Sequence, residues 1–172
     1  MGIGPDGRRF DARPEHSATH EIIMLENKLA ALAGQSRFAN ALLLLARIGM
    51  SIEFVLFGGM KIVNNANMQA YMETHGVPGQ LIWLVVIIQL LGGACVIVGF
   101  QTRTAAALLG GFCLVATGIF HSNFADMREV SDFTKDLATA GGFALLFLRG
   151  PGNYSFDALR SQFHQKGSGS GG

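Results

Sequence analysis

Three charged side chains occur within or directly after one long apolar run of this chain, at a spacing that brings them together. The run extends from Ala39 to Met60 and contains Arg47 and Glu53, and Lys61 follows it directly. At about 100° per residue the three fall within about 120° of one another on a helix, so they share one face. Charged groups on a membrane-length helix face a partner or a polar cavity by default. We therefore expect Arg47 to pair with Glu53 and to fix the polar end of a ligand cavity; the alternative is a purely structural ion pair.

The amide of Gln89 is a second candidate, and it lies in another apolar run, from Leu81 to Phe100. Its depth from the outer end of its helix is similar to that of Glu53, so the two side chains could hydrogen-bond. Gly92 and Gly93 lie about one turn further along the same face and leave room beside Gln89 for a neighbouring backbone or a flat ligand. The amide could then hydrogen-bond a ligand carbonyl; the alternative is a polar contact between helices.

Polar residues also flank the outer ends of the last two predicted helices. These are His121, Asn123, Lys135 and Asp136, and a compact bundle would place them near Lys61. Together they would line an outward-facing polar cavity, and His121 or Lys135 would carry protons from the outer surface. The alternative is a solvated rim with no chemical role.

Two uncharged runs of membrane length position these groups. Leu81 to Phe100 and Thr104 to Phe120 are separated only by Gln101, Thr102 and Arg103. At 1.5 Å per residue the runs span about 30 and 25 Å, close to the hydrocarbon thickness of a bilayer. Because backbone polar groups in lipid must be satisfied within the segment, this spacing predicts a transmembrane helical hairpin.

Two further helices complete the predicted bundle. Ala39 to Met60 is long enough to span despite its charges, whereas Leu137 to Leu148 reaches spanning length only if Phe133 to Asp136 begin the helix. We therefore predict an all-α fold, an integral membrane four-helix bundle over residues 39–159.

The composition agrees with a membrane solvent and excludes several function classes. Hydrophobic residues make up 49% of the chain and charged residues 15%, against about 25% charged in soluble domains. A net charge of +1 gives no basis for nucleic-acid binding. The sequence contains no phosphate-binding loop, no zinc-ligand spacing and no flavin, haem or iron–sulfur motif, so no metal site is predicted. Cys95 and Cys113 lie at different depths, so a disulfide between them is not expected.

The distribution of Lys and Arg predicts the orientation, because positive residues are retained on the cytoplasmic side. With the N-terminus inside, that side collects Lys28, Arg37, Arg103, Arg149 and Arg160. The other side has only three, among several acids: Lys61, Arg128 and Lys135. We therefore expect both termini in the cytoplasm. Residues 1–38 would form an N-terminal segment with an interfacial helix, and residues 160–172 a tail that ends in a Gly/Ser linker.

Several segments, taken in order, resemble the DoxX/DoxD family of membrane proteins. They are the hairpin linker Gly99–Thr104, the helix exit Phe120–Phe124, Lys135 before Leu137, and the ending Gly150–Asp157. The first helix also fits, with Arg47 and the close Gly58, Gly59, Lys61. The order and spacing of these pieces are specific, and the resemblance covers roughly residues 40–159. The chain looks most similar to the small DoxX-type proteins, which implies a multi-pass protein of the bacterial inner membrane.

The resemblance also implies a link to redox chemistry. Some members resemble or form the membrane subunit of a thiosulfate:quinone oxidoreductase, and others are linked to quinone or oxidative stress responses. Two positions depart from the family pattern, which usually has Glu where this chain has Gln89 and Asn where it has Asp136. Glu53 is unusual for the first helix of the family and lies at the depth of the missing Glu, so we expect it to supply the same charge.

Our leading hypothesis is a membrane protein that binds a quinone-like or other small apolar redox molecule and serves an oxidoreductase system. Electrons would come from the ligand or a partner subunit, so the chain alone would not be a complete enzyme. A second hypothesis is a non-catalytic membrane partner or assembly subunit. Small residues at four-residue spacing, such as Ala107 and Gly111, would let its helices meet a membrane or periplasmic protein partner, or a second copy in a homo-oligomer. A third is a small oligomeric transporter.

Overall fold

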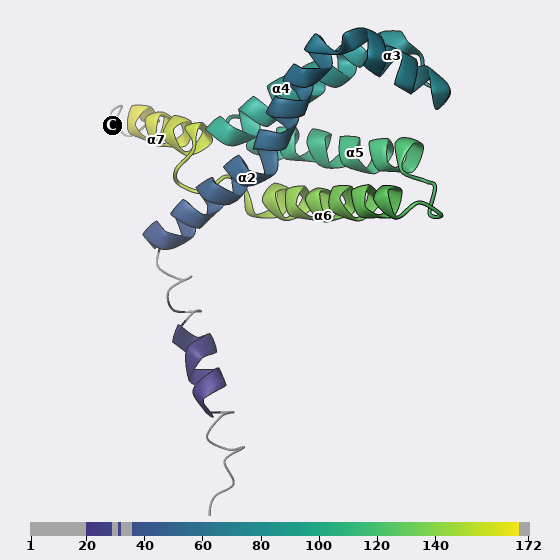
Figure 1. The fold of residues 1–172 in the computed structure, drawn as a ribbon. Coiled ribbons are helices and arrows are strands. Elements are labelled where there is room, and N and C mark those ends of the chain that lie inside the picture. The colour runs from purple at the N-terminus through teal and green to yellow at the C-terminus, as the bar shows by residue number, and fades with distance from the viewer. Residues whose placement is uncertain (1–19, 29–30, 32–35, 169–172) are drawn as a thin grey trace, which may run out of the picture. The chain divides into compact units, whose positions relative to one another are not determined.

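The computed structural model describes residues 20–28, 31 and 36–168, and every regular element within them is helical (Figure 1). Residues 20–28 form a short helix in the unit that ends at Ala39. The other helices lie in, or extend into, a second compact unit that begins at Asn40 and is described here by itself. The predicted all-α class is confirmed.

Among the described residues, three helices are long and apolar enough to cross a membrane. The first predicted run lies within α2 (Ser36–Val63), the second is contained largely in the single turn η1 (Gly79–Leu81) and α4 (Ile82–Val98), and the third lies within α5 (Thr102–Phe120). At 28 residues, α2 is about 42 Å long. It therefore exceeds the hydrocarbon thickness of about 30 Å, and its ends reach the interfacial layers.

The three-residue linker between α4 and α5 lies two residues earlier in the chain than the apolar runs predict, because both helix ends are fixed by specific contacts. Gly99 ends α4 in the left-handed region at φ +78°, and its N–H donates to the carbonyl of Cys95 at 2.9 Å. The carboxylate of Asp157 accepts hydrogen bonds from the N–H groups of Gln101 and Thr102 at 2.9 and 3.0 Å. These two donors would otherwise lack partners at the start of a helix, so α5 begins two residues before Thr104.

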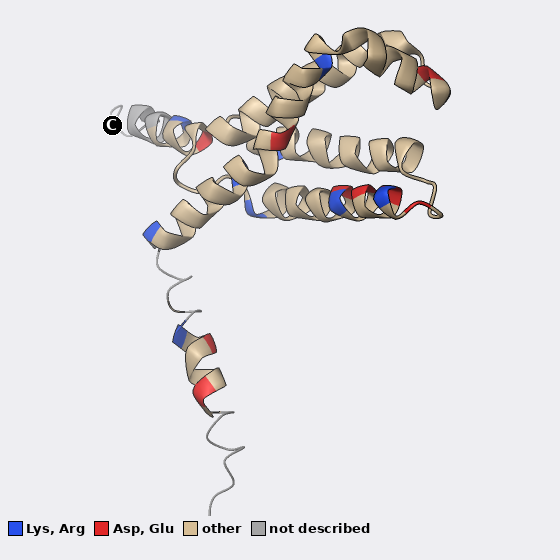
Figure 2. Cartoon of the chain, viewed as in Figure 1, with Lys and Arg blue, Asp and Glu red and all other residues tan. Residues whose placement is uncertain are grey.

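The fourth helix of the bundle, α6 (Met127–Arg149), begins well before the predicted start near Leu137. Asp126 caps it by accepting a hydrogen bond from the N–H of Arg128 at 2.9 Å. Charged residues crowd its first half, as Figure 2 shows: Arg128, Glu129, Asp132, Lys135 and Asp136. The helix therefore has spanning length, 23 residues, but one end is too polar to count as a span by composition.

Two further helices are absent from the sequence-based prediction. A short helix, α3 (Asn65–Thr74), follows α2, and α7 (Phe156–Ser168) follows the loop after α6. Neither is apolar enough to reveal itself as a membrane segment. Met72 of α3 is nonetheless buried and packs with Ile82 and Val86 of α4, so tertiary contact rather than composition defines this element.

Close packing of α5 on α6 forms the centre of the bundle, where the two helices run side by side (Figure 1). A Cβ at Gly110 would lie 3.2 Å from the Cβ of Phe143, so glycine permits this approach. The ring of Phe143 meets that of Phe54 from α2 edge to face, with centroids 5.5 Å apart. Phe112 meets Phe54 in the same way at 6.5 Å. These aromatic rings join α2 to the α5–α6 pair.

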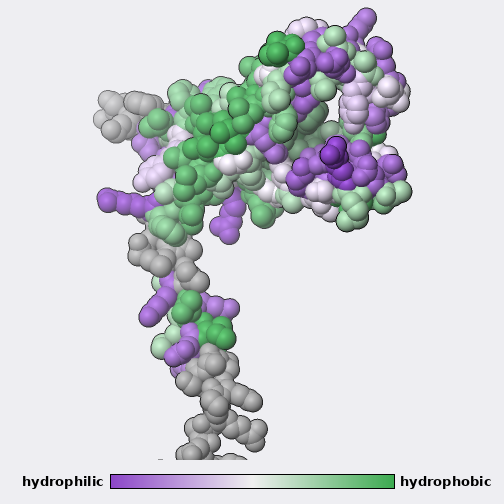
Figure 3. All heavy atoms as spheres, viewed as in Figure 1, coloured by the Kyte–Doolittle hydropathy of each residue, from purple (hydrophilic) through white to green (hydrophobic). Residues whose placement is uncertain are grey.

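Large apolar side chains are exposed on α2 and α4, on the face that Figure 3 shows. Each of the following is more than half exposed: Leu45, Leu56 and Phe57 on α2, and Leu84 and Leu91 on α4. Such a surface is stable in lipid, where it needs no polar cover. We call the end of the bundle that carries Lys61, His121 and the first turns of α6 the polar end. The opposite end, where Gly99–Gln101 and residues 150–157 meet α2, is the junction end.

Candidate functional site

Five of the seven predicted site residues form one electrostatic group at the polar end. Asp136 of α6 lies at its centre and interacts electrostatically with His121, Lys135 and Lys61. Glu53 of α2 interacts in turn with Asp136 and Lys135. Side chains from α2, α6 and the end of α5 therefore converge, as the sequence predicts for these five. We call these five residues the polar group.

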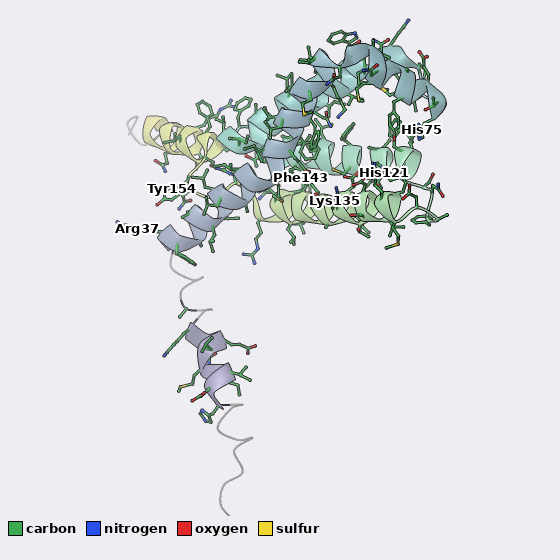
Figure 4. The ribbon with its side chains drawn as sticks, viewed as in Figure 1. Arg37, His75, His121, Lys135, Phe143 and Tyr154 are labelled. Atoms are coloured by element: carbon green, nitrogen blue, oxygen red, sulfur yellow. The ribbon has the colours of Figure 1, made fainter. Side chains whose placement is uncertain are left out.

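A short contact between His121 and Glu129 and an ion pair between Lys135 and Asp132 mark the rim of the polar group. Nδ1 of His121 lies 2.8 Å from a carboxylate oxygen of Glu129, and both side chains are about three-quarters buried, at 23% and 25% exposure. Nζ of Lys135 lies 2.6 Å from a carboxylate oxygen of Asp132 and is mostly exposed. Figure 4 shows His121 and Lys135 on the neighbouring α5 and α6. His121 is therefore the group that links the half-buried Asp136 to the surface, whereas Lys135 belongs to the solvated rim.

The sixth predicted residue, Gln89 of α4, is buried against α2. A Cβ at Gly58 of α2 would lie 3.2 Å from the Cβ of Gln89, and Gly58 lies one turn before Lys61 on α2. The Oε1 atom of Gln89 has no hydrogen-bond partner within the described residues. The direct hydrogen bond that the sequence predicts between Gln89 and Glu53 is therefore not made by this atom.

Two buried residues that sequence reasoning did not single out as site residues lie in the second half of α5, which leads to the polar end. Thr117 is buried, and its Oγ1 also has no hydrogen-bond partner in the described part of the chain. Cys113 lies one turn earlier on the same face and is also buried. Side chains lean toward the N-terminus of their own helix, so Gln89 and Thr117, on antiparallel helices, lean toward the same level. The only signal in the sequence was the spacing of Cys113 and Thr117, which lie four residues apart and so share one face of the helix.

The seventh predicted residue, Arg47, lies apart from the polar group. Its side chain is fully buried, and Nη1 and Nη2 donate to the backbone carbonyls of Pro151 and Tyr154 at 2.9 and 2.5 Å. Neither contact involves Glu53, whose charged neighbours lie on α6. The predicted pairing of Arg47 with Glu53 is wrong, because the chain after α6 folds back and supplies carbonyl oxygens in place of a carboxylate.

Asp157 completes the junction end. Burial acts to raise the pKa of its carboxyl group, but the hydrogen bonds from the backbone of Thr102 and Gln101 and from the Thr102 hydroxyl outweigh burial and lower it. The N–H of Asp157 donates in return to the carbonyl of Gly99 at 2.9 Å. The hairpin linker and the chain ending, noticed in the sequence as separate motifs, are thus two halves of one contact.

An aromatic cluster covers the polar end. Tyr71 of α3 stacks on Phe120 at the end of α5, with ring centroids 5.6 Å apart, and His75 contacts both rings. Figure 4 shows His75 extending from α3 toward α5. Burial raises the pKa of Tyr71, and the negative charges of Glu129 and Asp132 raise it further. Tyr71 and His75 are thus site-adjacent residues that the polar sequence of α3 alone does not reveal.

These groups provide hydrogen-bonding and proton-accepting atoms rather than a metal site. Within the described ranges, no group of three or more His, Cys, Asp or Glu side chains is arranged to hold a metal ion. The polar group supplies two carboxylates and two cationic groups of α2 and α6, and Gln89 and Thr117 supply polar atoms with unmet hydrogen bonds. Such a set can orient a small polar head group and exchange protons with it.

Comparison with known proteins places this arrangement in context. The family model named DoxX matches residues 42–122. Inner membrane protein YqjF of Escherichia coli (strain K12) is 46% identical over 116 residues, which cover 67% of this chain and 89% of that protein. Inner membrane protein YphA of the same organism is 30% identical over 124 residues, covering 67% and 88%. No solved structure matches the chain.

Proposed function

The chain belongs to the DoxX family of integral membrane proteins, and from this premise we propose that it binds a quinone-like molecule at the polar end and serves a membrane oxidoreductase system. The two relatives are inner membrane proteins, and we extend that location to this chain, with both termini in the cytoplasm. A quinone-like ligand suits a membrane site because its tail can remain in lipid while its polar head reaches buried hydrogen-bonding groups.

The unpaired Oε1 of Gln89 is the observation that carries the proposal. A buried acceptor left without a partner costs about 1 to 3 kcal/mol. The burial of Oε1 therefore favours a ligand that donates a hydrogen bond to it. A primary amide both donates and accepts. Nε2 of Gln89 can therefore donate to the carbonyl of the oxidised head group, and Oε1 can accept from the hydroxyl of the reduced one. The hydroxyl of Thr117 offers a further hydrogen-bonding group.

The polar group would handle the protons that such a ligand gains or loses. Asp136 is the central carboxylate, and its electrostatic neighbour His121 contacts Glu129 at the surface. Protons would move between the head group and Asp136, and then to His121 and the outer surface. Glu53 provides a second carboxylate on the opposite helix. Electrons would be exchanged with a separate redox partner, because the residues of the site supply none.

A binding titration with a matched amide control tests this proposal. Protein purified in mild detergent is titrated with a short-tailed ubiquinone analogue, and bound native quinone is measured in a lipid extract. We expect Gln89→Leu to weaken binding at least about tenfold, the equivalent of about 1.4 kcal/mol. Gln80→Leu, at an exposed amide of η1, should leave binding unchanged. Equal affinity of all three proteins, or no binding by the parent, would refute the proposal.

Exposed glycines favour a second candidate function, a membrane partner or assembly subunit. A Cβ at Gly59, Gly111 or Gly118 would meet no other atom within 4 Å, so these faces of α2 and α5 are open. Small residues on lipid-facing helices allow close approach of another helix. Native mass spectrometry of the gently purified protein distinguishes the two functions, because a co-purifying protein without quinone would favour the second.

A further inference from the structure

Two buried polar atoms of α2 lack hydrogen-bond partners within the described residues, and they lie one turn apart on the same face. They are Nε of Arg47 and Oγ of Ser51. Neither residue has any exposed surface. Positions four apart on a helix are neighbours, so the two side chains lie next to each other on this face of α2, which we call the polar patch. This patch lies toward the junction end and shares no residue with the polar group or with Gln89.

The other atoms of Arg47 are already engaged. Nη1 and Nη2 donate to Pro151 and Tyr154, which leaves the Nε–H as a donor that can be satisfied only by an acceptor. The backbone of α4 closes the patch, since a Cβ at Gly93 would lie 3.2 Å from the carbonyl oxygen of Ser51. A Cβ at Gly99 would lie 2.5 Å from Nη1 of Arg47. Glycine at both positions brings polar atoms of α2 against main chain.

We propose that Arg47 Nε and Ser51 Oγ together bind one internal water molecule between α2 and α4. Water can accept from the Nε–H and also donate to, or accept from, the serine hydroxyl, and buried waters typically join two to four otherwise unpaired polar groups. Rotation of Ser51 toward the carbonyl of Arg47, a common arrangement for helical serine, would satisfy Ser51 alone. A bound water satisfies both atoms.

The charges near the patch favour water over a small anion. Asp157 already interacts electrostatically with Arg47, and the carbonyl oxygens of Pro151 and Tyr154 surround the other guanidinium nitrogens. A further negative charge would be repelled by these oxygens and would leave a net negative charge beside Arg47 and Asp157. A neutral acceptor supplies the missing hydrogen bond without adding charge. The water thus completes the hydrogen bonds of an arginine held inside the membrane.

Solid-state NMR of the protein in liposomes tests the site directly. The Nε–H signal of Arg47 is identified by its loss in Arg47→Lys, and Arg149, which is exposed, serves as the reference for contact with bulk water. We expect magnetisation transfer to the Arg47 Nε–H from a water molecule that exchanges with bulk water more slowly than the water at Arg149 does. Ser51→Val, which fills the patch with methyl groups, should abolish that transfer.

Two outcomes would overturn the proposal. Absence of water transfer to Arg47, with transfer present at Arg149, would exclude a bound water. A change in the Arg47 signal when bromide replaces chloride would instead identify an anion. Thermal unfolding supplies an independent measurement: Ser51→Val should lower the melting temperature by about 3 °C, and Ser51→Ala by less. If Ser51→Val melts at or above the parent temperature, Ser51 is bonded only within its helix and the proposal fails.

Discussion

Nη2 of Arg47 donates to the backbone carbonyl of Tyr154, which follows it by 107 residues in the chain. This contact joins α2 to the loop between α6 and α7, and Nη1 reinforces it through Pro151. A buried guanidinium that binds two carbonyl oxygens fixes the path of the chain after α6. Arg47 therefore acts on the architecture of the junction end rather than on the site at the polar end.

Replacing Arg47 should release the segment after α6. Arg47→Met removes two hydrogen bonds and leaves the carbonyls of Pro151 and Tyr154 unpaired, so we expect a loss of about 2 to 4 kcal/mol in unfolding free energy. Thermal unfolding in detergent and limited proteolysis near residues 151–155 would measure it. Arg149→Met, at an exposed residue, is the control. Equal protease resistance of the two variants would contradict the assignment.

A comparison of alanine substitutions at Gly99 and Gly76 separates the cost of backbone strain from the cost of a steric clash. Both have positive φ, +78° and +75°, but only at Gly99 would a Cβ meet other atoms, at 2.5 Å from both Nη1 of Arg47 and Cβ of Ser155. Gly76→Ala should cost about 1 to 2 kcal/mol from the left-handed backbone alone. Gly99→Ala should cost clearly more, measured by thermal unfolding. Similar losses would show that the junction end tolerates displacement.

Asp157 should make stability depend on pH only in acid. Its pKa in the folded protein is lowered by the hydrogen bonds from Thr102 and Gln101, so its contribution is complete above the unfolded value of about 3.9. The contribution is lost as the pH falls below that value through the folded pKa. Melting temperatures between pH 6 and pH 3 should therefore fall more for the parent than for Asp157→Asn. Parallel curves would argue against this role.

Glu53→Gln should not destabilise the protein at neutral pH. Because Glu53 interacts with Asp136 rather than with Arg47, removing its charge relieves repulsion between two carboxylates, at the cost of a weaker attraction to the exposed Lys135. We expect an unchanged or slightly higher melting temperature, which corresponds to a change of at most about 1 kcal/mol in unfolding free energy. Adding Asp136→Asn to Glu53→Gln should bring no further gain from this repulsion. A clearly lower melting temperature for Glu53→Gln would instead support an ion pair between Glu53 and Arg47.

The predicted orientation can be tested with two isosteric changes. Ser131 and Ser161 are both exposed on helices, α6 and α7. In a variant lacking Cys95 and Cys113, Ser131→Cys should react with a membrane-impermeant thiol reagent in intact cells, and Ser161→Cys should react only after the membrane is opened. This follows from the excess of Lys and Arg on the cytoplasmic side. The reverse pattern would invert the assignment.

The sequence by itself determined the membrane class, the helical fold and the three apolar spans, because apolar runs of bilayer length, two of them without a charge, have no other stable structure in lipid. It also indicated that Glu53, Lys61, His121, Lys135 and Asp136 gather at one end, since depth along a helix follows directly from residue count. Family resemblance pointed correctly to the linker after α4 and the ending after α6 as important segments.

Only the tertiary structure decided which groups are partners. Depth along α2 made Glu53 the nearest acid to Arg47, but hydrogen bonding depends on which way a side chain faces and on what the rest of the chain brings there. The early start of α6 and the existence of α3 were likewise set by a cap at Asp126 and by packing of Met72, neither of which leaves a hydrophobic signature. Periodicity and length are local properties that a sequence records, whereas the pairing of Arg47 with Tyr154 arises from a return of the chain across the bundle.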